Sequence, residues 1–193
     1  MYDFIKGEIV EISPAHLVLE NQNIGYYINI SVNTYSNFSD KKNCLIFIHE
    51  VIREDSHQLF GFFDKKEREI FLNLISVSGV GANTARVMLS SLSPDEIKNA
   101  IIGNNIVLLK SVKGIGAKTA ERIIIDLRDK VGKIEDGDQI PVRLDNTIQH
   151  EALSALVMLG FPKIKVEKII NGILKENNDL SIEMLIKESL KRI

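Results

Sequence analysis

Cysteine is almost missing from this chain, which has Cys44 alone among its 193 residues. A single cysteine excludes an intramolecular disulfide and any zinc or iron–sulfur site built on several thiolates. No apolar stretch reaches the roughly 18 residues that a membrane-spanning helix needs. The N-terminus also lacks the basic segment and apolar core of a secretory signal. These absences favour a cytoplasmic protein.

Motifs for nucleotide and metal chemistry are missing as well. The chain has no Gly-x-x-x-x-Gly-Lys-Ser/Thr sequence, so we expect it neither to bind nor to hydrolyse ATP. His49 and His57 have no second histidine or carboxylate at a convincing metal spacing. Both are interpreted as surface or hydrogen-bonded histidines. The sequence therefore predicts no cofactor and no metal site.

Charge is unevenly distributed, although the net charge is only −2. Residues 1–63 carry eight Asp or Glu and four Lys or Arg, whereas residues 64–133 carry eight acidic and twelve basic side chains. Residues 134–193 carry ten acidic and eight basic ones. A basic middle segment is what binding to a phosphate backbone requires. The acidic segment before it needs a separate explanation.

The basic segment contains an internal repeat. Residues 77–89 and 112–124, which are 35 positions apart, share the pattern apolar-x-Gly-apolar-Gly-Ala-x-Thr-Ala. Apolar helical runs flank the glycines in both copies. Because repeats at a fixed offset indicate repeated structural units, each copy predicts a helix, a glycine turn and a second helix.

A glycine turn of this kind can bind a phosphate. Two glycines around one aliphatic residue make a tight hairpin, and the next helix begins with unpaired N–H donors at the positive end of its dipole. Such a site holds a phosphate backbone without reading bases. Lys118 and Arg122, one turn apart on the second outgoing helix, should face the same phosphates. The expected backbone donors are the N–H groups of Gly79, Gly81, Ala82, Gly114, Gly116 and Ala117.

Either copy alone would more often be an ordinary glycine-turned helical hairpin, because helix turns and nucleotide loops also use Gly-x-Gly. Two copies in register, each followed by Thr-Ala, weaken that interpretation. The pair resembles a tandem helix-hairpin-helix, a motif that binds DNA phosphates. For Lys118 and Arg122 the alternative is a solvated helix face, which Glu121 would partly neutralise.

Short strands are predicted before the repeat. Five runs of strand-forming residues are separated by turn signals such as Ser13-Pro14. They cover residues 4–12, 16–19, 26–30, 44–52 and 59–63. Five short strands in about sixty residues suggest a five-stranded OB-type barrel. Residues 53–57 then form a polar turn between the fourth and fifth strands.

Helices are predicted for the rest of the chain, which makes it a multidomain α+β protein. Ser93, Pro94 and Glu96 form a helix start signal. The expected parts are an OB-type barrel at 1–63, an all-α tandem helix-hairpin-helix domain at 64–133, a flexible linker at 134–146 and a three-helix bundle at 147–193. The bundle, with its Leu-Gly-Phe turn, is similar to ubiquitin-associated (UBA) domains. Its predicted core contains Leu156, Ile169, Ile173 and Leu185.

The order of these parts resembles the RuvA family, the Holliday-junction-binding subunits of bacterial branch-migration machines. The matching stretches are residues 51–55 and 59–62, both glycine hairpins and the C-terminal helical part. The resemblance implies that Glu54 and Asp55 form an acidic pin at the centre of a homotetramer, and it leaves open whether the assembly on DNA is a tetramer or an octamer. It also implies contact of residues 147–193 with the RuvB ATPase, which uses ATP and Mg, and it offers the RuvC resolvase as a further candidate partner of the protein.

The first hairpin departs from the family pattern. RuvA-like first hairpins generally have a proline where Ala82 stands and a lysine where Asn83 stands. Asn83 can donate a neutral hydrogen bond but contributes no charge. Arg86, three residues further on, could restore that charge, and we predict it as a further phosphate contact.

Two other functions fit part of the sequence. Helix-hairpin-helix DNA glycosylase/lyases use a lysine after the turn as a Schiff-base nucleophile together with a downstream aspartate. Lys118 and Asp136 would have these roles here. Asp136, however, falls in the predicted linker, and that class predicts neither a duplicated motif nor a barrel before it. The other alternative is a general accessory protein that binds duplex or single-stranded DNA.

Overall fold

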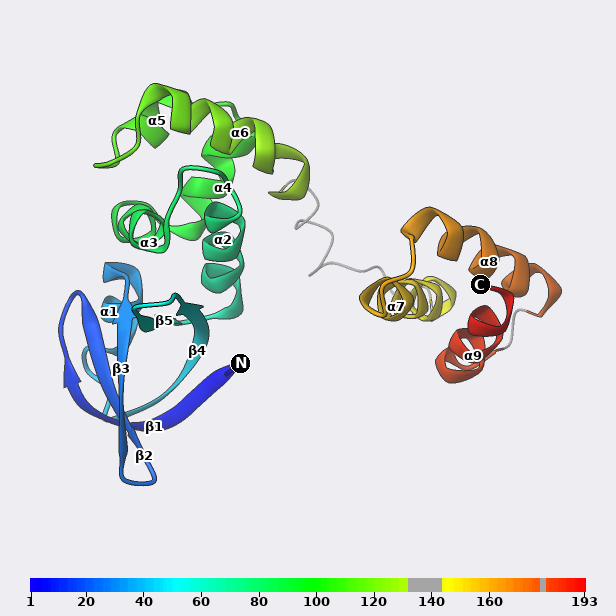
Figure 1. Cartoon of the computed structure of the whole chain (residues 1–193), viewed down its shortest axis with the longest axis horizontal. Coiled ribbons are helices and arrows are strands. Elements are labelled where there is room, and N and C mark those ends of the chain that lie inside the picture. Colours follow the sequence, from blue (N-terminus) through cyan, green and yellow to red (C-terminus); the bar gives the residue numbers. More distant parts are fainter. Residues whose placement is uncertain (132–143, 178–179) are drawn as a thin grey trace. The chain divides into compact units, whose positions relative to one another are not determined.

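A computed structural model describes residues 1–131, 144–177 and 180–193. The chain divides into two compact units at residue 135, a barrel with helices and a separate three-helix bundle (Figure 1). Within the described residues, every helix is too short or too polar to span a bilayer.

The barrel is closed, and its strands follow the order β1-β2-β3-β5-β4. The strands are β1 (Phe4–Ile12), β2 (His16–Asn21), β3 (Ile24–Ile30), β4 (Asn43–Ile52) and β5 (His57–Phe62). Only the β3–β5 pair is parallel. All five predicted strands are therefore confirmed. The β2–β3 turn needs just Gln22 and Asn23, both at positive φ, as a two-residue hairpin requires.

One helix in this part of the chain was not predicted. Helix α1 (Val32–Phe38) follows β3 and begins at Ser31, whose hydroxyl accepts a hydrogen bond from the Thr34 N–H at 3.0 Å. With seven residues, α1 is too short to show a periodic apolar pattern. The capping residue Ser31 was therefore the only sign of this helix in the sequence.

The helical part of the first unit, as far as the structure describes it, contains five helices. They are α2 (Lys65–Ile75), α3 (Ala82–Ser91), α4 (Pro94–Ile102), α5 (Ile106–Lys110) and α6 (Ala117–Val131). The predicted capping box at α4 is confirmed: the Ser93 hydroxyl accepts from the Glu96 N–H, and the Glu96 carboxylate accepts from the Ser93 N–H. The first hairpin is α2–α3, and the second is α5–α6.

The barrel and the helices share one apolar core. Phe60 and Phe62 of β5 pack with Phe71 of α2 at ring-centroid distances of 5.3 and 4.8 Å, and all three are buried. Because these aromatic side chains come from both parts, the predicted boundary at residues 63 and 64 lies inside one compact unit.

A buried carboxylate links the two parts next to this core. Glu67 of α2 is 3% exposed and accepts hydrogen bonds from the Ser31 hydroxyl (2.5 Å), the Thr34 hydroxyl (2.6 Å) and the Phe63 N–H (3.1 Å). Burial raises the pKa of Glu67, although these three donors act in the opposite direction. Asp64, the cap of α2, raises that pKa slightly further.

The second unit contains α7 (Leu144–Met158), α8 (Lys163–Glu176) and α9 (Ile182–Arg192). The predicted three-helix bundle is confirmed, as is the burial of Leu156, Ile173 and Leu185. Ile169 is only partly buried, because Ile170 takes the fully buried position on α8. The predicted linker ends earlier than expected, at the start of α7, and its part before Leu144 lies outside the described residues.

Glu67 gives the stability of the protein a defined pH dependence. Because its folded-state pKa is raised, Glu67 stabilises the folded protein fully below its ordinary pKa of 4.5, and this contribution is lost as pH rises through the folded pKa. We expect the free energy of unfolding of wild type, minus that of Glu67→Gln, to fall over this window and then to level off. Urea unfolding at several pH values measures this difference; a constant difference would contradict the prediction.

Candidate nucleic-acid interface

The two glycine turns have the same backbone geometry. Gly79 and Gly114 occupy equivalent positions with φ of 93° and 95°, a conformation that glycine adopts without strain. In the first turn the Val80 N–H donates to the Val77 carbonyl at 3.0 Å. In the second, the Ile115 N–H donates to Val112 at 3.1 Å. The repeat seen in the sequence is therefore a repeat of structure.

The glycines of both turns face open space. A Cβ placed on Gly79, Gly81, Gly114 or Gly116 would meet no protein atom within 4 Å. Nothing in the fold needs the missing side chains for packing, so the free space is available to an approaching group. A close approach to backbone N–H groups is what phosphate binding at a helix N-terminus requires.

The helices after the turns begin with unused donors. The first backbone bonds inside them are Ala85 N–H to the Gly81 carbonyl and Ala120 N–H to the Gly116 carbonyl, each at 2.9 Å. Helix α3 has no side-chain cap. Within the described residues, the predicted donors at Gly79, Gly81, Ala82, Gly114, Gly116 and Ala117 make no intramolecular hydrogen bond. The predicted positions are thus brought together at two equivalent sites, although the Ala82 side chain is buried.

The second turn carries the positive side chains. Lys118 is exposed in the first turn of α6, and Lys113 is exposed just before Gly114. Arg122, also exposed, donates from Nη1 to the Ser78 carbonyl of the first turn at 3.2 Å. Arg122 therefore stands between the two turns and links them, a contact between copies that the sequence did not predict.

The structure places Arg86 away from the first turn. Its Nη1 donates to the Ala15 carbonyl at 2.8 Å and lies 3.4 Å from the Asn29 Oδ1, both in the barrel. Asn83 is exposed at the turn. The expectation that Arg86 supplies the charge missing at Asn83 does not match this geometry, because the α3 face that carries Arg86 is turned to the barrel.

The acidic turn between β4 and β5 is tight and exposed. The Arg53 N–H donates to the Ser56 carbonyl at 2.8 Å, which closes a four-residue turn with Glu54 and Asp55 at its tip. Both carboxylates are exposed. The two predicted pin residues are therefore both accessible at the surface of the barrel.

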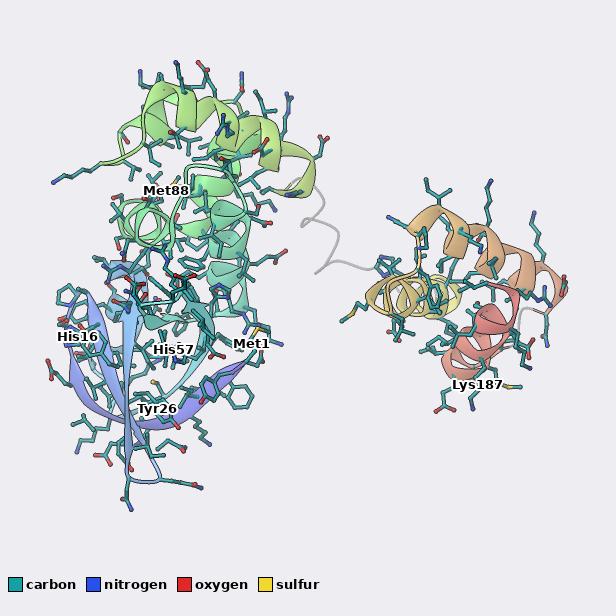
Figure 2. The ribbon with its side chains drawn as sticks, in the orientation of Figure 1. Met1, His16, Tyr26, His57, Met88 and Lys187 are labelled. Carbon is teal, nitrogen blue, oxygen red and sulfur yellow. The ribbon has the colours of Figure 1, made fainter. Side chains whose placement is uncertain are left out.

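Glu50 braces the base of this turn. Its carboxylate accepts from the Tyr2 N–H at 2.6 Å and contacts the His57 Nε2 at 3.1 Å and the Met1 amino group at 3.6 Å. Glu50 therefore joins the N-terminus of the chain at Met1 to the start of β5 at His57. Both residues are labelled in Figure 2. The Tyr2 N–H, followed by His57, holds the pKa of Glu50 below its usual value. Among the described residues, no three His, Cys, Asp or Glu form a group suited to a metal.

Comparison with known families accounts for nearly the whole chain. The RuvA N terminal domain matches residues 1–61, the SAM-like helix-hairpin-helix tandem matches residues 71–129, and the RuvA C-terminal domain matches residues 147–193.

Full-length relatives give the same result. The Holliday junction branch migration complex subunit RuvA of Azobacteroides pseudotrichonymphae is 51% identical over 99% of both chains. The subunits of the same name from Bacteroides thetaiotaomicron and Christiangramia forsetii are each 48% identical over the whole of both chains.

The open glycines allow a test that leaves the fold intact. Gly81 has φ of −85°, so Gly81→Ala with Gly116→Ala should change stability little and place two methyl groups where a phosphate would approach. We expect duplex DNA affinity to fall by about tenfold or more, because charge-assisted hydrogen bonds are lost. Fluorescence anisotropy measures it. Gly172→Ala on α8, which also meets no atom within 4 Å, is the matched control; equal affinities would refute the assignment.

Proposed function

The chain belongs to the RuvA family, and we propose that it is the DNA-binding subunit of a complex that drives branch migration at Holliday junctions. It serves homologous recombination and DNA repair in the cytoplasm. It holds the four-way junction open and has no catalytic site of its own. The observation that carries this proposal is the pair of open glycine turns on the same compact unit as an exposed acidic turn.

The two features have opposite effects on DNA. The glycine turns, with Lys118 and Arg122, attract the phosphates of the duplex arms. Glu54 and Asp55 repel phosphates, by about 1 kcal/mol for a charge pair about 4 Å apart in water. Carboxylates at the crossover therefore raise the energy of a closed junction and favour one whose strands are parted. This difference explains why a DNA-binding protein has an acidic barrel.

Four subunits suit a junction with four equivalent arms. In a homotetramer with four-fold symmetry, each subunit would hold one arm with its two turns, and four acidic turns would meet at the centre. A second tetramer on the opposite face would give an octamer. The RuvC resolvase is a further candidate partner, because an open junction is its substrate class.

The second unit is proposed to bind the RuvB ATPase, which supplies the ATP and Mg chemistry. Its apolar surface is concentrated at the α7–α8 turn, where Met158, Leu159 and Ile164 are 88, 62 and 75% exposed. Gly160, with φ of 95°, shapes this turn. Exposed apolar side chains that are close in sequence on a small folded unit are typical of a protein interface.

A glycosylase/lyase is not supported. The relatives that match the full length of the chain are named as branch-migration subunits. Lys118 is exposed at the second turn, and the first turn has Asn83 at the equivalent position. Asp136 lies outside the described residues. Activity on lesion-containing duplex is therefore not expected.

Neutralising the acidic turn should separate affinity from selectivity. Wild type should prefer a four-way junction to linear duplex in competition at raised salt. In Glu54→Gln with Asp55→Asn, duplex affinity should stay equal or increase, because repulsion is removed, and the preference for the junction should fall by about tenfold. Fluorescence of 2-aminopurine at the crossover reports its opening. An unchanged preference together with an unchanged crossover would rule out the role of the acidic turn.

The exposed α7–α8 turn should be needed to stimulate the RuvB ATPase but not to bind DNA. Met158→Ser with Leu159→Ser removes exposed apolar surface without touching the buried core. Junction affinity should stay unchanged, and stimulation of RuvB ATPase activity by the junction complex should be lost, as with a chain ending at residue 132. Glu167→Gln, an exposed change on α8, is the control. Full stimulation by the double variant would contradict this surface.

A further inference from the structure

Arg86 fastens the first glycine turn to the barrel. Its Nη1 donates to the Ala15 carbonyl at 2.8 Å and lies 3.4 Å from the Asn29 Oδ1. Ala15 lies in the β1–β2 turn, which the Ser13 hydroxyl closes by accepting from the N–H groups of Ala15 (3.3 Å) and His16 (3.1 Å). The partner of Arg86 is therefore a rigid part of the barrel.

The other hydrogen bonds between α3 and the first 63 residues, within the described residues, come from α1 and lie at the far end of α3. The Ser90 hydroxyl accepts from the Val32 N–H at 3.2 Å, and the Leu89 carbonyl accepts from the Asn33 Nδ2 at 2.6 Å. Arg86 is one helical turn nearer to the glycine turn than these contacts. Without it, α3 would keep its polar attachment at its C-terminal end only.

We infer that Arg86 is a positioning residue that sets the preference for four-way junctions over linear duplex, by fixing the first glycine turn relative to the acidic turn. This inference rests on the proposed function. The positioning role takes the place of the phosphate contact that the sequence predicted for Arg86. The first turn, which has Asn83 where charge would be expected, thus uses its nearby arginine for geometry.

The reason lies in how many sites each DNA uses at once. A linear duplex needs only the two glycine turns, which Arg122 links directly to each other through the Ser78 carbonyl. A junction must also fit the acidic turn of the barrel. Simultaneous binding at linked sites is strong only where their geometry matches the ligand. Looser attachment of the first turn therefore weakens junction binding selectively.

The test compares Arg86→Met, which keeps a long unbranched side chain, with Arg86→Lys, which keeps a charged donor. Affinities for a synthetic four-way junction and for a linear duplex of the same arm sequence are measured over a range of salt concentrations. We expect Arg86→Met to lower the junction-to-duplex affinity ratio by at least about tenfold. Duplex affinity and its salt dependence should remain those of wild type, and Arg86→Lys should restore most of the ratio.

Each other outcome overturns the inference in a recognisable way. A parallel loss of junction and duplex affinity, with a salt slope reduced by about 0.9, would make Arg86 a phosphate contact. Lys118→Met, which removes an exposed charge at the second turn, provides the reference for that behaviour. A lowered melting temperature with an unchanged ratio would make Arg86 purely structural. If Arg86→Met does not fold, Arg86→Gln takes its place, and an unchanged junction-to-duplex ratio in Arg86→Gln decides against the inference. A wild type without junction preference would instead refute the proposed function.

Discussion

The buried carboxylate of Glu67 is the interaction on which the first unit depends. It accepts hydrogen bonds from Ser31 and Thr34 of the barrel side and from the Phe63 N–H where β5 leads into α2. A buried carboxylate without these donors would cost several kcal/mol, so its partners must stay in place. The barrel and α2 are thereby held in one arrangement. The acidic turn and the glycine turns, which lie on different sides of this link, consequently act as parts of one body.

The glycine turns show how little a phosphate site needs to contain. Gly79 and Gly114 supply a backbone conformation, and the open space at all four glycines supplies access. Charge is added unequally. The second turn has Lys118 and Arg122, whereas the first has the neutral Asn83 and an arginine directed to the barrel. The two copies therefore share a fold but differ in role. The second contributes positive charge, and the first is held in position by the contact of Arg86 with the barrel.

Much of this fold could be predicted because the signals are local. Alternating and periodic apolar residues indicated all five strands and every described helix except α1. Ser93 with Glu96 marked a helix start that the hydrogen bonds confirm. The failures have equally physical causes. Helix α1 is too short to show a period. Ile169 and Ile170 differ by one position on α8, and periodicity alone does not decide which of two adjacent isoleucines is fully buried.

The sequence by itself determined the two glycine turns, the acidic turn and the family resemblance, because each depends on residue types at fixed spacing. Only the tertiary structure decided where the arginines go. Arg86 is the fifth residue of α3 and Arg122 the sixth of α6, and both helices follow a glycine turn. Arg86 nevertheless reaches the Ala15 carbonyl, and Arg122 reaches the Ser78 carbonyl. A long flexible side chain binds the acceptor that folding brings within its reach, and that acceptor lies 71 residues away along the chain for Arg86 and 44 for Arg122.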